Sequence, residues 1–316
     1  MSTNVDAGRI NTSASKKRAI NVIPGYANVV LHALLFLGSA VCILPLVMIV
    51  SASLTENKTL ELAGYAFWPR NFTLSAYNYL FRLGSFVGLA YKNTIIATLA
   101  GTAVCVFTVG LYAYPLSRKD CRFNGFFTFI SFFTMLFGGG LVPFYILCTQ
   151  FLRISDTIWA LFLPAGFSPF WVIVMRTFYK TNVPDEIIES ARIDGASEWR
   201  TLFQIVAPLA VPGLATVALF STIGLWNNFF LCLLLIKDQR LYTLQYMIYS
   251  MLNNIQFLKA AAANLGVVYA SDALANLPSE SFRMAMAVVT IGPIIVAYPF
   301  FQRFYMKGLT IGALKG

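Results

Sequence analysis

Six long apolar runs dominate the chain and restrict it to folds that place most of its length in a membrane. The runs cover roughly residues 29–50, 93–114, 126–147, 157–178, 205–236 and 284–304. A helix of about 22 residues is roughly 33 Å long, enough to cross the hydrocarbon core of a bilayer. Hydrophobic residues form 58% of the chain and charged residues 11%, so a soluble fold would expose too much apolar surface. The sequence therefore predicts an all-α polytopic membrane protein with six transmembrane helices.

Basic residues are distributed unevenly among the segments that connect these runs. Fourteen of the 23 lie in the two tails, after the second run, or around the charged segment that follows the fourth run. Loops rich in lysine and arginine remain in the cytoplasm. We therefore expect cytoplasmic tails at residues 1–28 and 306–316, a cytoplasmic segment at 183–204, and a periplasmic segment at 237–283. Since no small-residue cleavage site follows the first run, we expect that run to remain as a membrane helix.

The cytoplasmic segment 183–204, here called the charged stretch, has the pattern of two short helices joined by a bend. Pro184 suits the first turn of a helix, and the acidic residues that follow it suit the positive end of the helix dipole. Asp194-Gly195 can end this helix, because glycine accepts the left-handed conformation of a C-terminal cap. Trp199, Leu202, Phe203 and Val206 then recur at helical spacing. Docking of a soluble partner is the favoured interpretation, and an amphipathic helix on the inner leaflet is the alternative.

Several kinds of chemistry are missing from the sequence. The 13 acidic residues all lie outside the six runs, whereas ion-coupled carriers usually place a carboxylate near the middle of the membrane. The chain has no GxxxxGK[ST] phosphate-binding loop, and its single histidine supports no catalytic triad or metal cluster. Its five cysteines lack CxxC spacing and are expected to be packing residues. These observations predict a non-enzyme that binds no cofactor and receives its energy from a soluble partner.

The net charge of +10 does not indicate nucleic-acid binding, because the bases lie in short segments between apolar runs. Two polar or flexible segments are candidates for a transport pathway. Gly138, Gly139 and Gly140 are followed by Pro143, and such a break in a membrane helix fits either a pathway lining or a simple kink. Trp226, Asn227 and Asn228 offer a ring and amides for a sugar, although an aromatic belt at the membrane interface is the favoured interpretation.

The charged stretch resembles the EAA loop of ATP-binding-cassette (ABC) importer permeases. The resemblance rests on Glu189-Ser190-Ala191, Gly195, Ile205 and Pro208, with Ser190 and Ala207 as departures from the family pattern. It extends over nearly the whole chain and is most similar to the carbohydrate branch, the MalG-type permeases. Within that branch the looser resemblance is to the second permease of alginate importers. The segments that carry the wider resemblance are Lys92-Asn93-Thr94, Gly139–Pro143, Trp226-Asn227, Tyr298-Pro299-Phe300 and Lys307–Gly316.

The resemblance implies a type I importer permease fold, called MetI/MalG-like, in a bacterial inner membrane. It implies a second homologous permease, two copies of a cytoplasmic ATPase that hold ATP and Mg²⁺, a periplasmic binding protein, and an oligosaccharide as cargo. It also implies that Glu189, Ala191 and Gly195 couple the permease to the ATPase, supported by Arg192, Asp194 and Ala196. Two other hypotheses stay open at this point: an ion-coupled secondary sugar carrier, and a membrane scaffold that holds an ATPase without transporting.

Overall fold

The computed structural model describes residues 25–82, 84–265, 280–293, 295 and 299. Its contacts divide the chain into two units, residues 1–47 and 48–316, each of which is considered by itself. The first unit contributes most of α1 (Gly25–Ser53), an uncharged apolar helix that contains Pro45. The predicted tails 1–28 and 306–316 fall wholly or mostly outside the described residues.

The second unit is helical, and its described residues contain one isolated antiparallel β-bridge, between Thr55 and Phe72. Small helices α2 (Asn57–Ala63) and α3 (Ser75–Arg82) precede the long helix α4 (Gly84–Ser117). The later elements are α5 (Asn124–Leu136), α6 (Leu141–Ile146), η1 (Leu147–Phe151), η2 (Ile158–Leu161), η3 (Leu163–Ala165), α7 (Pro169–Asn182), α8 (Asp185–Ile193), α9 (Glu198–Arg200), η4 (Thr201–Val206), α10 (Ala207–Leu209), α11 (Val211–Trp226), α12 (Phe230–Leu235), η5 (Gln239–Leu241), α13 (Leu244–Leu265) and a helix over 280–293. The all-α prediction is confirmed.

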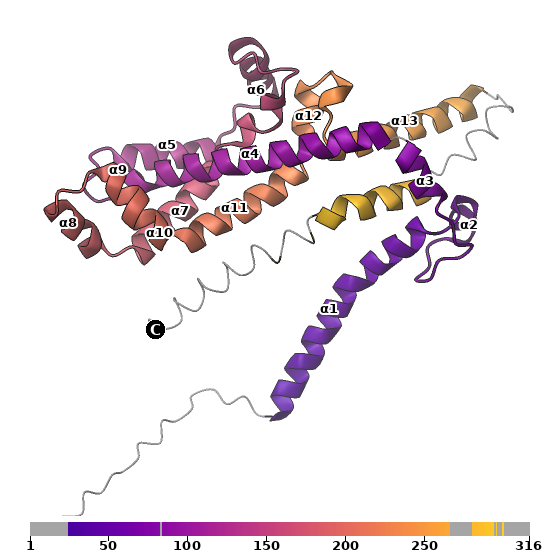
Figure 1. Cartoon of the computed structure of the whole chain (residues 1–316), viewed down its shortest axis with the longest axis horizontal. Coiled ribbons are helices and arrows are strands. Elements are labelled where there is room, and N and C mark those ends of the chain that lie inside the picture. Colours follow the sequence, from indigo (N-terminus) through magenta and orange to yellow (C-terminus); the bar gives the residue numbers. More distant parts are fainter. Residues whose placement is uncertain (1–24, 83, 266–279, 294, 296–298, 300–316) are drawn as a thin grey trace, which may run out of the picture. The chain divides into compact units, whose positions relative to one another are not determined.

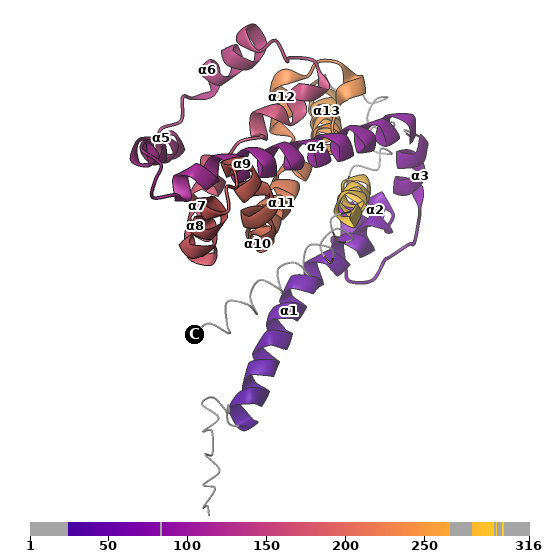
Figure 2. The same ribbon diagram turned by 60° about the vertical axis from the view of Figure 1, so that its left-hand side comes forward.

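Helix α4 is the axis of the second unit, and its 34 residues give it a length of about 51 Å. It packs along α11 and α7, and small residues permit the close approach. A Cβ at Gly101 would lie 2.7 Å from Cδ1 of Leu225 and 2.8 Å from Cβ of Phe162. Figures 1 and 2 show α8 and α9 near one end of α4 and α13 near the other. The charged stretch and α13 therefore lie toward opposite ends of the same long helix.

Three of the apolar runs are broken rather than straight. The chain bends by 111° between Asn124–Leu136 and Leu141–Phe151, by 49° between Ile158–Ala165 and Pro169–Asn182, and by 78° between Glu198–Leu209 and Val211–Trp226. Each bend lies beside glycine or proline, which interrupt the hydrogen-bond ladder of a helix. Among the described residues, two helices are long and apolar enough to span a membrane, or five if each bent pair is one span. Most of the predicted sixth span, 284–304, continues past the last continuously described residue, 293.

Two boundaries differ from the sequence-based expectation. The helical path of the charged stretch continues to Leu209 through a wide π turn at Thr201–Val206, so the apolar helix begins at Val211 instead of near 205. Pro212 lacks an N–H and cannot continue the preceding ladder, which places the bend at Ala210. The predicted periplasmic segment 237–283 contains one 22-residue helix, α13, where short helices were expected.

Candidate functional site: the charged stretch and two cavities

Local sequence signals explain the shape of the charged stretch. Helix α8 starts directly after Pro184, carries Asp185 and Glu186 in its first turn, and has Arg192 in its last turn, as the helix dipole favours. It ends where Gly195 adopts φ +76° and the Ala196 N–H donates to the Ala191 carbonyl at 2.9 Å. Ser197 caps α9 by accepting from the Arg200 N–H. The predicted pair of helices with a bend at Asp194-Gly195 is confirmed.

One face of α8 is buried in the core of the unit. Ile188 and Ala191 are 3% and 6% exposed, and Ile188 lies in a cluster with residues of α4, α7 and α11. The neighbouring Ile187 is 39% exposed. In the second helix Leu202 and Val206 are buried, while Trp199 and Phe203 are exposed and stack on each other with ring centroids 6.1 Å apart. The charged stretch is thus anchored by its apolar face and presents its other face outward.

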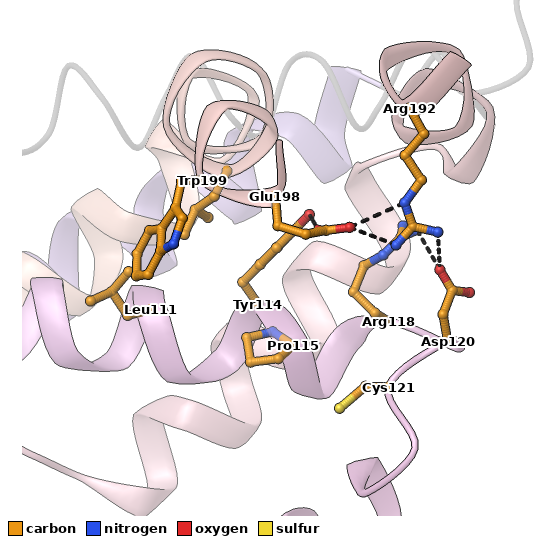
Figure 3. Close-up of a pocket in the computed structure, with 10 residues that line it drawn as sticks. Leu111, Tyr114, Pro115, Arg118, Asp120, Cys121, Arg192, Glu198 and Trp199 are labelled. Atoms are coloured by element: carbon orange, nitrogen blue, oxygen red, sulfur yellow. Dashed lines mark hydrogen bonds and ion pairs between the residues drawn. The ribbon is translucent and has the colours of Figure 1, made fainter. Parts of the chain in front are cut away.

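Arg192 occupies the centre of an ion-pair network that fastens the charged stretch to the end of α4. Its guanidinium donates to Asp120, which lies in the loop after α4, and to Glu198 Oε1 of α9 at 2.7 Å. Glu198 Oε2 also accepts from the Tyr114 hydroxyl of α4 at 2.9 Å. Figure 3 shows these side chains converging from three segments. A single arginine therefore joins both short helices to α4.

A second set of pairs starts at the first turn of α8. Asp185 pairs with Lys119 at 2.9 Å and with Arg118 at 3.5 Å, and Arg118 also pairs with Asp120 at 3.3 Å. Arg118 is only 8% exposed. We call the six residues of these two sets the charge cluster; its members are Arg118, Lys119, Asp120, Asp185, Arg192 and Glu198. Sequence reasoning identified only Arg192 of this group as a candidate, although the run Arg118-Lys119-Asp120 was a visible signal.

The charge cluster keeps its members ionised. Hydrogen bonding from Arg192 lowers the pKa of Asp120 and that of Glu198, and hydrogen bonding from Lys119 lowers the pKa of Asp185. The hydrogen bonds to Glu198, first, and to Asp120 raise the pKa of Arg192. The hydrogen bond to Asp185 raises the pKa of Lys119. These five groups are therefore charged near neutral pH.

Other acids of the charged stretch remain available to a partner. Glu186, Glu189 and Asp194 are exposed, and within the part of the chain that the structure describes they form no ion pair. The acids of the charged stretch thus divide into two groups. Asp185 and Glu198 pair with basic residues of the charge cluster, and the other three are directed to solution. Of the predicted coupling residues, Ala191 is buried, Ala196 is half-buried, and Glu189, Arg192, Asp194 and Gly195 are exposed.

A cavity of about 410 Å³ lies between the charge cluster and α4 (Figure 3). Arg118, Asp120, Arg192 and Glu198 form its polar side. Its apolar side consists of Leu111, Pro115, Trp199 and Leu202. The cavity lies beside the apolar contact that Ile188, Leu202 and Val206 make with α4 in the core of the unit.

The candidate pathway residues are only partly brought together. Gly138, Gly139, Gly140 and Asn228 line one cavity of about 480 Å³, here called the glycine cavity. Gly140 has φ +84°, a conformation that glycine adopts without strain. Asn228 accepts at Oδ1 from the Leu231 N–H at 3.0 Å and so caps α12.

Trp226 and Asn227 lie outside the glycine cavity. The Trp226 side chain is 6% exposed and its Nε1 donates to the Thr290 carbonyl at 3.2 Å, which differs from the aromatic-belt expectation. The reason is packing against Tyr91 and the helix 280–293, segments far away in sequence. The Asn227 amide donates to the Ile223 carbonyl at 2.9 Å.

Metal chemistry has no support in the described residues. Among them, no three His, Cys, Asp or Glu side chains are placed to hold a metal ion. The five cysteines are free, and Cys105, Cys148 and Cys232 are buried among apolar side chains. Cysteine behaves here as a small apolar residue.

Comparison with known proteins shows a family match and several similar proteins. The family model described as "Binding-protein-dependent transport system inner membrane component" matches residues 106–310. Protein LplC of Bacillus subtilis (strain 168) is 36% identical over 287 residues, 90% of this chain and 93% of LplC. The polygalacturonan/rhamnogalacturonan transport system permease protein YtcP of the same organism is 30% identical over 292 residues, 92% of this chain and 98% of YtcP.

A solved structure agrees with these relatives. It is the crystal structure of a bacterial ABC transporter involved in the import of the acidic polysaccharide alginate. One of its chains is 28% identical and superposes with a TM-score of 0.70, over 88% of this chain and 96% of that chain. The chain therefore belongs to the family of inner-membrane components of binding-protein-dependent transport systems, the permease subunits of ABC importers.

Proposed function

We propose that this permease moves oligosaccharides from a periplasmic binding protein into the cytoplasm, with ATP hydrolysed on a partner ATPase. The observation that carries the proposal is the charged stretch itself, an anchored helix pair with three free carboxylates on its outer face. A chain without intramembrane acids in its six apolar runs needs such an external energy source.

Glu189, Ala191 and Gly195 are the proposed coupling residues. Glu189 is exposed on α8 and offers a charge to a partner cation. Ala191 is buried one turn before the bend, and Gly195 forms the bend with a positive φ. Arg192, Asp194 and Ala196 complete the proposed contact, with Arg192 holding the helix pair to α4. A partner that moved this surface would therefore move α4 as well.

The proposed assembly contains a second homologous permease and two copies of the ATPase, which hold ATP and Mg²⁺; this chain binds no cofactor. Both termini and the charged stretch lie in the cytoplasm of a bacterium in this proposal, as the positive-inside distribution of basic residues supports. Helix α5 is apolar, yet among its residues only Ser131 is buried within the chain. Its outer surface is free for lipid or for the second permease.

The cargo is proposed to be an oligosaccharide, with acidic oligouronides as the first substrates to test. The support is that YtcP is named for polygalacturonan and rhamnogalacturonan, and that the similar solved structure belongs to an alginate importer. Alginate itself is the narrower possibility within this class. Candidate pathway residues are Gly139, Gly140 and Asn228, which line the glycine cavity.

The test is ATP-dependent uptake of trigalacturonate and an alginate trisaccharide by the purified complex in vesicles, with its binding protein. We expect Glu189→Lys to lower uptake roughly tenfold or more, because like charges at a docked interface cost several kcal/mol. The comparison variant is Glu186→Lys, the same charge reversal one turn earlier on α8. Glu186 also faces outward but lies outside the family pattern, so its reversal should lower uptake clearly less than that of Glu189.

Two outcomes would contradict the proposal. Full uptake and full ATPase association in Glu189→Lys would remove the coupling role of this residue. Uptake by the chain alone, driven by an ion gradient without ATPase, would instead establish the secondary-carrier hypothesis.

A further inference from the structure

A row of aromatic rings runs from the start of α13 to Phe229, the residue before α12. Tyr242 and Tyr246 have ring centroids 4.6 Å apart, Tyr246 and Tyr249 6.4 Å, and Tyr249 and Phe229 5.0 Å. We call these four residues the aromatic row. Figure 1 shows α12, which begins just after Phe229, between α6 and the start of α13, and Figure 2 agrees.

One end of the aromatic row lines a cavity, and the other end lies next to a second cavity along the chain. Tyr242 lines a cavity of about 210 Å³ together with Gln239, Ser250 and Asn254. Phe229 stands in sequence between Asn228 and Phe230, which both line the glycine cavity, although Phe229 itself does not line it. The row therefore runs from the smaller cavity toward the glycine cavity, and its middle rings lie on one face of α13 at helical spacing.

The rings are held in place but remain accessible. Tyr249 is 39% exposed and Phe229 37% exposed, whereas Tyr242 and Tyr246 are half-buried. Asn93 of α4 donates to the carbonyls of Arg240 and Tyr242 at 2.7 and 3.1 Å, and Thr94 accepts from the Leu244 N–H at 2.8 Å. These buried bonds fix the start of α13 on α4, so the row is preorganised.

The chemistry of the row and of its two cavities is that of sugar recognition. Aromatic faces pack against the C–H faces of sugar rings, and amide and hydroxyl groups bind sugar hydroxyls. In the described part of the chain, the side chains of Gln239, Ser250 and Asn254 make no hydrogen bond that would occupy them. No residue lining either cavity and no residue of the row is charged.

We infer that the aromatic row is an oligosaccharide-binding surface, which receives the sugar at the outer end of α4 and delivers it to the glycine cavity. This inference rests on the proposed function. The surface recognises the faces of sugar rings and not their charge, so it accepts neutral and acidic oligosaccharides alike. Selection of an acidic substrate then belongs to other components of the importer.

The row is tested with the complete complex and its binding protein, using trigalacturonate and its uncharged counterpart galactotriose. Removal of the most exposed ring by Tyr249→Ala should lower the maximal uptake rate of both sugars by a similar factor, about three- to tenfold. ATP hydrolysis stimulated by the loaded binding protein should persist, because the charged stretch is intact. Tyr249→Phe keeps the ring and should transport nearly as the wild type does.

The matched control is Tyr145→Ala on α6, since Tyr145 is also 39% exposed but belongs neither to the row nor to the lining of these two cavities. Equal uptake in Tyr249→Ala and Tyr145→Ala would overturn the row while leaving the proposed function intact. Loss of trigalacturonate uptake alone would overturn the claim that the surface ignores charge. A wild-type complex that takes up neither sugar would contradict the proposed function and the inference resting on it.

Discussion

At the scale of single residues, Arg192 has the most specific role, because it contacts two carboxylates from different segments. Asp120 and Glu198 lie 72 and six positions away in sequence. All three are largely exposed, and exposed ion pairs contribute little to stability individually. Together they hold α8 and α9 against the end of α4. A movement of the charged stretch would pass to α4 through these contacts.

This arrangement predicts coupled effects of Arg192→Gln and Asp120→Asn. Each substitution should lower ATP-driven uptake by roughly two- to fivefold, and the double variant should lose less than the two single losses combined, because the Arg192–Asp120 contact is removed in both. Uptake per ATP hydrolysed is the measurement. Arg200→Gln is the control, since Arg200 lies on the same stretch and its guanidinium, among the described residues, bonds Gln204 and no carboxylate. Fully additive losses would show that Arg192 and Asp120 act independently.

The lowered pKa values of Asp120, Asp185 and Glu198 predict how the charge cluster responds to acid. A carboxylate whose pKa is lower in the folded state stabilises the fold above its ordinary pKa, and this contribution disappears as pH falls through the lowered value. The cluster should therefore be unchanged between about pH 6 and 8 and open only below the ordinary carboxyl range, about pH 4. Hydrogen exchange at residues 185–200 measures this, and opening near pH 6 would contradict it.

At the scale of elements, the close contact of α4 with α11 depends on Gly101. A methyl group there would press on Leu225 and Phe162, so Gly101→Ala should destabilise the protein by about 1–3 kcal/mol. Gly88→Ala on the same helix meets nothing within 4 Å and should be neutral or slightly stabilising, since alanine favours helix. Thermal unfolding of the purified protein compares the two. Equal melting temperatures would mean that α4 and α11 do not pack as described.

Elements also show where sequence reasoning succeeds. Pro184 and the acids that follow it act on the first turn of α8, and Gly195 acts just after its last turn. Each signal is local, so the sequence alone predicts where α8 begins and ends. The start of the fifth apolar helix lies at Val211 and not near residue 205, because a π turn carries the helical path of the charged stretch past that boundary. The motif Lys92-Asn93-Thr94 was recognised as a resemblance, but its structural role in holding α13 required contacts with residues about 150 positions away.

At the scale of the whole molecule, the chain is the membrane component of an ABC importer and leaves ATP hydrolysis to a partner. In its second unit the charge cluster is attached to α4 at Tyr114, and the start of α13, which carries the aromatic row, is attached at Thr94. The 20 residue steps between them, about 30 Å of helix, separate the surface proposed to receive energy from the surface proposed to receive sugar. Both surfaces are built on the same rigid element.

The proposed orientation has a direct test by cysteine labelling. In a background without the five native cysteines, Glu186→Cys on α8 should react with a membrane-impermeant maleimide only from the cytoplasmic side. Asn253→Cys on α13 should react only from the periplasmic side, and both positions are exposed. Intact cells and inside-out vesicles give the two accessibilities. Labelling of both residues from one side would contradict the orientation.

The sequence alone determined the membrane character, the helical class and the bent helix pair, because hydrophobic transfer and local backbone preferences act over a few consecutive residues. Only the tertiary structure decided that Arg192 reaches Asp120 and that Trp226 is buried against the helix 280–293. It also decided that Tyr242, Tyr246, Tyr249 and Phe229 form one row. These features arise where segments distant in sequence meet around α4, and no local pattern encodes which residues will face each other there.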